Sequence, residues 1–152
     1  MPAPSLRAIA AYPAEIQARV ADLLAQNKLG AMLLQRYPEA HTHAAAGALY
    51  AYTQDLKNQY LRSSPPLSKV VYDDKLQVVE QALGMHSFVS RVQGNKLKAK
   101  KEMRIASLFR HVPESFLRMI VVHELAHLRE KSHNKAFYKL CEYMEPDYHR
   151  LE

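Results

Sequence analysis

The sequence predicts an α+β fold in which a small sheet lies between helical segments, and two observations support it. Residues 13–61 and 113–144 carry apolar side chains at helical spacing. Between the proline pair at 65–66 and Pro113, short runs of β-branched and aromatic residues are typical of strands instead. Hydrophobic residues make up 48% of the 152-residue chain, which is enough for one hydrophobic core.

The N-terminal part is predicted to be helical. A helix is expected over residues 13–29, because Pro13 suits the first helical position and Gly30 can end the helix. A short continuation is expected over residues 31–37. Residues 42–61 predict a second, longer helix, and the Ser-Ser-Pro-Pro run that follows breaks the pattern.

A small three-stranded sheet is expected next, with strands over residues 69–72, 88–92 and 102–109. Gly94 and Asn95 can form the tight turn that joins the last two strands. We expect the strand over 102–109 to form an edge of the sheet, where an extended peptide can pair with it.

Two helices complete the predicted fold. The first is expected over residues 113–129 with Pro113 at its start, and its apolar composition indicates a largely buried central element. The second is expected over residues 133–144 with Ser132 as its N-cap. Its predicted inward stripe consists of Ala136, Phe137, Leu140, Cys141 and Met144. Cys141 is the sole cysteine of the chain, so we expect a core residue rather than a disulfide.

The central helix contains a metal-binding pattern, His123-Glu124-Leu125-Ala126-His127. Its two histidines are four residues apart and therefore share one face of the helix. Their imidazoles can reach one Zn²⁺, while the Glu124 carboxylate lies beside it and can accept a proton from water. The pattern predicts His123 and His127 as zinc ligands and Glu124 as a general base.

A third zinc ligand is expected at His133, because a catalytic zinc ion usually takes three protein ligands. A continuous helix would place His133 roughly 120° away from the direction of His127, so the helix must end between them. The spacing matches the longer pattern H-E-x-x-H-x-x-G-x-x-H, but Glu130 replaces its glycine, so the turn must differ. Glu142 or Glu145 is the alternative third ligand.

Residues 121–138, with the sequence V-V-H-E-L-A-H-L-R-E-K-S-H-N-K-A-F-Y, resemble the YgjP-like predicted zinc metallopeptidases. The resemblance continues in S-R-V-Q-G-N-K-L-K at 90–98, R-I-A-S-L-F at 104–109 and P-D-Y-H at 146–149. Many members have S-R-W-G-S-C where this chain has S-R-V-Q-G-N, so no role of that Trp or Cys transfers.

The resemblance implies a minimal zincin-like core, related to SprT-like and Wss-like proteases, with His123, His127 and His133 on Zn²⁺ and Glu124 as base. We expect a single domain over 1–152, in which residues 1–62 form an N-terminal helical part and residues 63–152 the zincin core. The expected function is zinc-dependent hydrolysis of peptide bonds in a peptide or protein substrate.

The alternative function is that of a non-catalytic, zinc-stabilised module that binds nucleic acid or a protein partner. Glu124 favours hydrolysis, because a structural zinc ion is usually closed by four protein ligands and needs no carboxylate beside it. Tyr148 and His149 are further candidates for the site, as donors to an oxyanion.

The charge balance adds one partner class. Lys and Arg outnumber Asp and Glu by 21 to 15, which gives a formal net charge of +6. The hairpin carries Lys96, Lys98, Lys100, Lys101 and Arg104, which are candidate contacts to nucleic-acid phosphates or a charged guard of a sheet edge. No segment has the length and apolarity of a membrane span or secretory signal, so we expect a cytoplasmic protein without a membrane partner.

Overall fold

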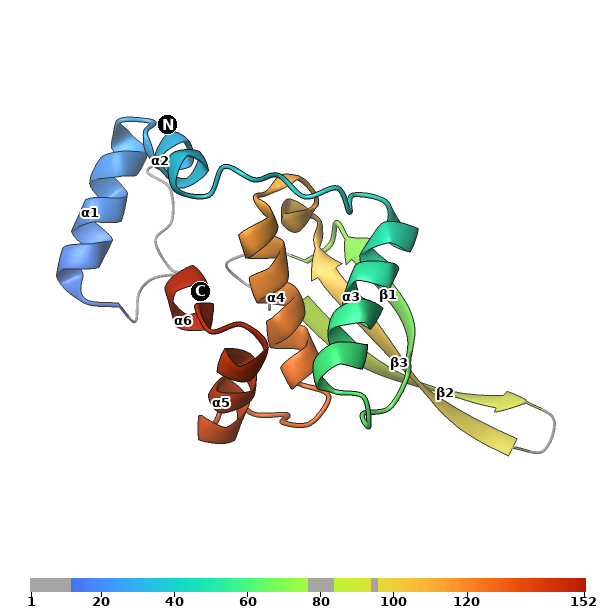
Figure 1. Ribbon diagram of the computed structural model, residues 1–152. Helices are drawn as coiled ribbons and strands as arrows, with labels where there is room; N and C mark the ends of the chain where they lie inside the picture. The colour runs from blue at the N-terminus through green and yellow to red at the C-terminus, as the bar shows by residue number, and fades with distance from the viewer. Residues whose placement is uncertain (1–11, 77–83, 94–95) are drawn as a thin grey trace.

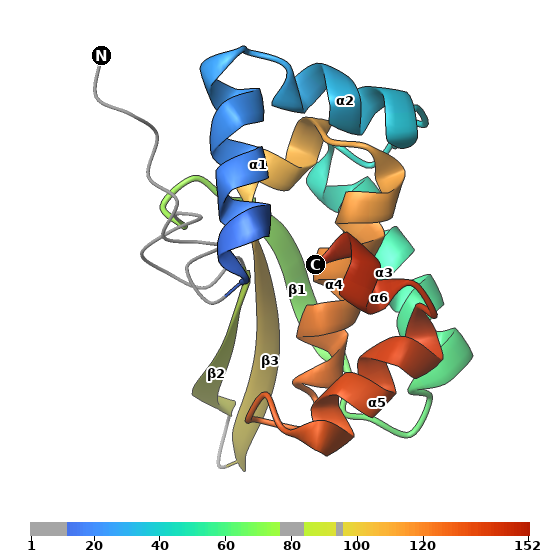
Figure 2. The ribbon, with the colours of Figure 1, turned by 90° about the vertical axis from the view of Figure 1, so that its left-hand side faces the viewer.

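The computed structural model describes residues 12–76, 84–93 and 96–152, apart from the side chains of Ala46, 84–93 and 96–101, and the fold is α+β. The elements in chain order are α1 (Ala14–Ala25), α2 (Leu29–Arg36), α3 (Ala46–Tyr60), β1 (Leu67–Asp73), β2 (Gly84–Gln93), β3 (Lys96–Ala106), the 3₁₀ helix η2 (Ser107–His111), α4 (Glu114–Ala126), α5 (Lys135–Met144) and α6 (Tyr148–Leu151). The strands form one layer, and α3, α4, α5 and α6 lie on one side of it (Figures 1 and 2). No helix within the described ranges has the length and apolarity to cross a membrane.

Strand β3 is the centre of the sheet, whose order is β1-β3-β2. It pairs in parallel with β1 and antiparallel with β2. Because residues 102–105 have a neighbour on both sides, the expectation that this segment forms an edge for peptide pairing is wrong. The strand also ends at Ala106, earlier than predicted, because η2 begins at the next residue.

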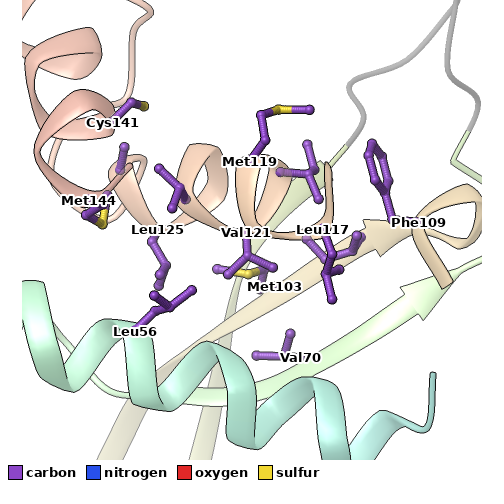
Figure 3. Close-up of a cluster of buried hydrophobic side chains, with 14 of the residues drawn as sticks. Leu56, Val70, Met103, Phe109, Leu117, Met119, Val121, Leu125, Cys141 and Met144 are labelled. Carbon is purple, nitrogen blue, oxygen red and sulfur yellow. The ribbon is translucent and has the colours of Figure 1, made fainter. Parts of the chain in front are cut away.

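The core lies between the sheet and α4. Figure 3 shows its side chains converging from five elements: Leu56 of α3, Val70 of β1, Met103 of β3, Leu117, Val121 and Leu125 of α4, and Cys141 and Met144 of α5. The prediction of a buried central helix is confirmed, since Val121, Val122 and Ala126 of α4 are also fully buried. Complete burial of a Val or Leu side chain contributes about 1.5–3 kcal/mol, so packing rather than intrinsic propensity holds α4 in place.

The sequence predicted that the first helix ends at Gly30. In the structure Asn27 forms the C-terminal turn of α1 instead. Asn27 has a left-handed φ of 55°. The N–H of Lys28 donates to the Leu23 carbonyl (2.9 Å) and the N–H of Asn27 to the Leu24 carbonyl (3.1 Å). This pattern is a Schellman motif, which asparagine can support in place of glycine. Gly30 lies inside α2.

Asn134, not Ser132, caps α5. The Asn134 side-chain oxygen accepts a hydrogen bond from the Phe137 N–H at 2.8 Å. His133 therefore lies in the loop before the helix rather than in its first turn. The buried stripe of α5 contains Phe137, Cys141 and Met144 as predicted, but Ala136 is exposed because it lies beside this narrow stripe and not on it.

Substitution of the cap tests this boundary. Asn134→Ala should lower the free energy of unfolding by about 1 kcal/mol, because the Phe137 N–H loses its partner. Ser132→Ala is the matched control and should change it by less than about 0.5 kcal/mol. Urea unfolding of the metal-free protein measures both values, and a larger loss for Ser132→Ala would contradict the assignment.

Candidate metal centre

Three histidine side chains converge beyond the C-terminal end of α4. His123 lies in its last turn, His127 is its C-cap residue, and His133 belongs to the loop before α5. The Nε2 atom of His133 lies 3.1 Å from Nε2 of His127 and 3.3 Å from Nε2 of His123. The structure thus brings together the three predicted metal-binding residues, with one candidate ligand atom of each within 4.8 Å of the others.

A tight turn after α4 makes this convergence possible. The N–H groups of Leu128 and Arg129 donate to carbonyls three residues earlier, at 3.0 and 3.1 Å, so the last turn narrows and the chain leaves the helix. Asn27 is the one non-glycine residue with positive φ in the described ranges. Glu130 therefore has an ordinary φ, which explains why this turn needs no glycine.

The three imidazoles fit a zinc ion. Metal–nitrogen distances of about 2.0–2.1 Å in tetrahedral geometry separate two ligand nitrogens by about 3.3–3.4 Å, close to the observed 3.1 and 3.3 Å. The backbone carbonyl of Glu130 lies 2.9 Å from Nδ1 of His127. A carbonyl only accepts hydrogen bonds, so His127 donates from Nδ1 and its Nε2 lone pair faces the other two histidines.

Glu124 is buried, with 2% of its surface exposed. It follows His123 directly on α4, which is the position that the H-E-x-x-H pattern assigns to the general base. A carboxylate is costly to bury in an apolar core, so its place in the largely buried helix α4 indicates a role other than packing.

Tyr148 contacts the histidine cluster from α6, in a way that spacing in the sequence did not reveal. Its hydroxyl lies 2.7 Å from Nδ1 of His123, and its side chain is fully buried. Burial raises the pKa of the Tyr148 hydroxyl, so it keeps its proton. Tyr148 is therefore on the Nδ1 side of His123, away from the Nε2 cluster, and not at the position expected for an oxyanion donor.

The other candidate residues have partners elsewhere. Glu145 forms an ion pair with Arg118 at 2.6 Å, and Glu142 contacts His149 at 2.7 Å. Neither acid joins the histidine group. His149 is likewise engaged with Glu142 on the surface rather than with the three imidazoles.

Of the basic hairpin residues, Arg104 alone has a described side chain, and that side chain is engaged. Its guanidinium contacts the carboxylates of Asp73 at 3.1 Å and Glu102 at 3.8 Å. The Lys75 N–H and this guanidinium lower the pKa of the Asp73 carboxyl. The side chains of the four hairpin lysines lie outside the described residues, so their phosphate contacts stay a prediction.

Comparison with known proteins gives two matches. The model of a family described as YgjP-like, metallopeptidase domain, matches residues 33–152, which extends the recognised resemblance upstream to include α3. The chain is also 60% identical to a UTP pyrophosphatase of Escherichia coli (strain K12) over 141 residues, covering 93% of this chain and 84% of that protein. No solved structure matches the chain.

Removal of the third imidazole tests the metal centre. His133→Ala should lower zinc affinity by about an order of magnitude or more, because three candidate ligands become two. His111→Ala, an exposed histidine of η2, should keep wild-type affinity. Competition with a chelator measures both, and unchanged affinity in the His133 variant would favour Glu142 or Glu145 as the ligand.

Proposed function

The chain belongs to the YgjP-like metallopeptidase domain family, and we propose that it is a metal-dependent hydrolase that cleaves UTP with release of pyrophosphate. The observation that carries the substrate is the 60% identity to a UTP pyrophosphatase over 93% of this chain. The family description also indicates a metal-dependent hydrolase, but one that acts on peptide bonds.

The geometry of the histidine cluster supports metal-dependent hydrolysis. A divalent ion held by His123, His127 and His133 would supply a Lewis acid and make water more acidic. The three imidazoles are neutral as ligands, so they add no negative charge to that of Glu124 against a polyanionic substrate. The formal net charge of +6 also favours the encounter with the negatively charged triphosphate.

Glu124 supplies the proton acceptor. In the proposed reaction a water oxygen bonds to the α-phosphorus of UTP while the bond from that phosphorus to the bridging oxygen breaks. The pyrophosphate leaves with the electron pair of the broken bond, and the water proton passes to the Glu124 carboxylate. Burial of Glu124 fixes its position within α4, so little reorganisation is needed before the proton transfer.

Peptide hydrolysis is the second candidate, favoured by the family description and by the H-E-x-x-H pattern. Because residues 102–105 of β3 are paired on both sides, an extended peptide would have to pair with β1, with β2 or with the first part of β3. The non-catalytic zinc module has less support, since the histidine group within the described residues offers three ligands rather than the four of a structural zinc site.

A direct assay separates these functions. Purified protein with Zn²⁺ or Mg²⁺ is incubated with UTP in H₂¹⁸O, and with an unfolded protein as the peptide substrate. We expect UMP and pyrophosphate from UTP, with the label on UMP because attack occurs at the α-phosphorus. Cleavage of the unfolded protein without UTP hydrolysis would replace the proposal by the peptidase.

Glu124→Gln tests the assigned base, because it keeps the size of the side chain and removes the proton acceptor. Turnover of UTP should fall by about 10²–10⁴-fold, while zinc binding stays near wild type. Glu142→Gln is the control with the same chemical change on the surface and should keep wild-type turnover. Loss of zinc from the Glu124 variant would show that this carboxylate is a ligand and would contradict its role as base.

The hairpin lysines are tested separately as contacts to nucleic acid. Replacement of Lys96, Lys98 and Lys100 by Gln should weaken binding of single-stranded DNA or RNA and reduce its salt dependence by roughly one unit of slope per lost contact. Fluorescence anisotropy at several salt concentrations measures this. A wild-type protein that binds neither nucleic acid at low salt would end the prediction without affecting the metal centre.

A further inference from the structure

We infer that Tyr148 is a positioning residue of the metal centre: its hydroxyl accepts the Nδ1–H of His123 and thereby keeps the Nε2 lone pair of His123 directed at the metal position. The inference rests on the proposed metal centre. It assigns to α6, an element far from the H-E-x-x-H pattern in sequence, a part in metal binding.

The contact between Tyr148 and His123 has the geometry of a hydrogen bond, and packing holds it in place. The Tyr148 oxygen and Nδ1 of His123 are 2.7 Å apart, and Tyr148 is fully buried. The two rings are nearly parallel, with an interplanar angle of 23° and centroids 6.3 Å apart. Packing therefore fixes the hydroxyl beside the imidazole, and water cannot readily replace it.

Cys141 is a second partner of the Tyr148 hydroxyl. The Tyr148 hydroxyl also hydrogen-bonds the side chain of Cys141, and burial keeps that thiol protonated by raising its pKa to about 12. A protonated thiol can donate to the hydroxyl or accept from it, and a hydroxyl oxygen has two lone pairs, so the Tyr148 oxygen can accept from His123 beside this contact. Nε2 of His123 lies 3.3 Å from Nε2 of His133, on the side of the metal position, so His123 as a ligand has its proton on Nδ1 and donates it to the Tyr148 oxygen.

His127 offers no equivalent test. Nδ1 of His127 is held by the Glu130 backbone carbonyl, which a substitution cannot remove. Tyr138 provides a matched control, because it is a partly buried tyrosine whose ring lies 6.3 Å from that of Tyr148 and 6.5 Å from that of His133. The structure gives its hydroxyl no hydrogen bond to any of the three histidines within the described residues.

The test uses Tyr148→Phe and Tyr138→Phe in the full chain, with zinc affinity measured against a chelator. We expect Tyr148→Phe to raise the dissociation constant for Zn²⁺ by about 10–100-fold and Tyr138→Phe to leave it unchanged. Equal affinity of the wild type and Tyr148→Phe would overturn the inference. A wild-type protein that binds no zinc would overturn the metal centre and this inference together.

A second measurement does not depend on the variant folding. In the metal-free wild-type protein, ¹⁵N NMR of the imidazoles should show His123 protonated at Nδ1. A wild-type His123 protonated at Nε2 would overturn the inference. Zinc affinities in the expected order without UTP hydrolysis would support the positioning role and refute the proposed substrate instead.

Discussion

The end of α4 at Ala126 is the constraint on which the candidate site depends. Helical spacing places His123 and His127 on one face, but the same spacing would carry His133 away if the helix continued. Hydrogen bonds to carbonyls three residues back narrow the last turn, and the Glu130 carbonyl then accepts from the imidazole of His127. The turn at which the chain leaves α4 thus also orients the imidazole of His127.

The C-terminal helices α5 and α6 contact α4 near both of its ends. Near the start of α4, the Arg118 guanidinium contacts the Glu145 carboxylate at 2.6 Å and the Met144 carbonyl at 2.9 Å. Near its end, Tyr148 contacts His123. These links, added to a shared apolar core, hold the loop of His133 between two fixed helices, so little conformational entropy remains to be lost when a ligand is bound.

The sequence predicted those features of the site that the spacing of residues along a helix determines. A four-residue spacing of histidines on an apolar helix determines their common face, and six residues to His133 require a turn. It was uninformative where two residues suit one position: Ser132 and Asn134 are both good N-caps, and only the structure shows that Asn134 is the cap. The residue pattern that predicts a strand does not indicate the order of the strands in the sheet, so the central place of β3 could not be predicted. Tyr148 was missed as a support of His123 because the contact joins residues 25 positions apart.

The strand order has a consequence for biosynthesis. β3 is the last strand in chain order, yet it is the partner of both β1 and β2. On the ribosome the two earlier strands therefore emerge before the strand that pairs with them, and α4, which covers the same sheet, emerges later still. Unpaired strands are templates for association with other chains. Four lysines lie between residues 96 and 101 of β3, the strand that pairs with both β1 and β2. Their like charges disfavour pairing of β3 with the same strand of another copy. Folding yield at high chain concentration, rather than the stability of the finished domain, is the property that this topology puts at risk.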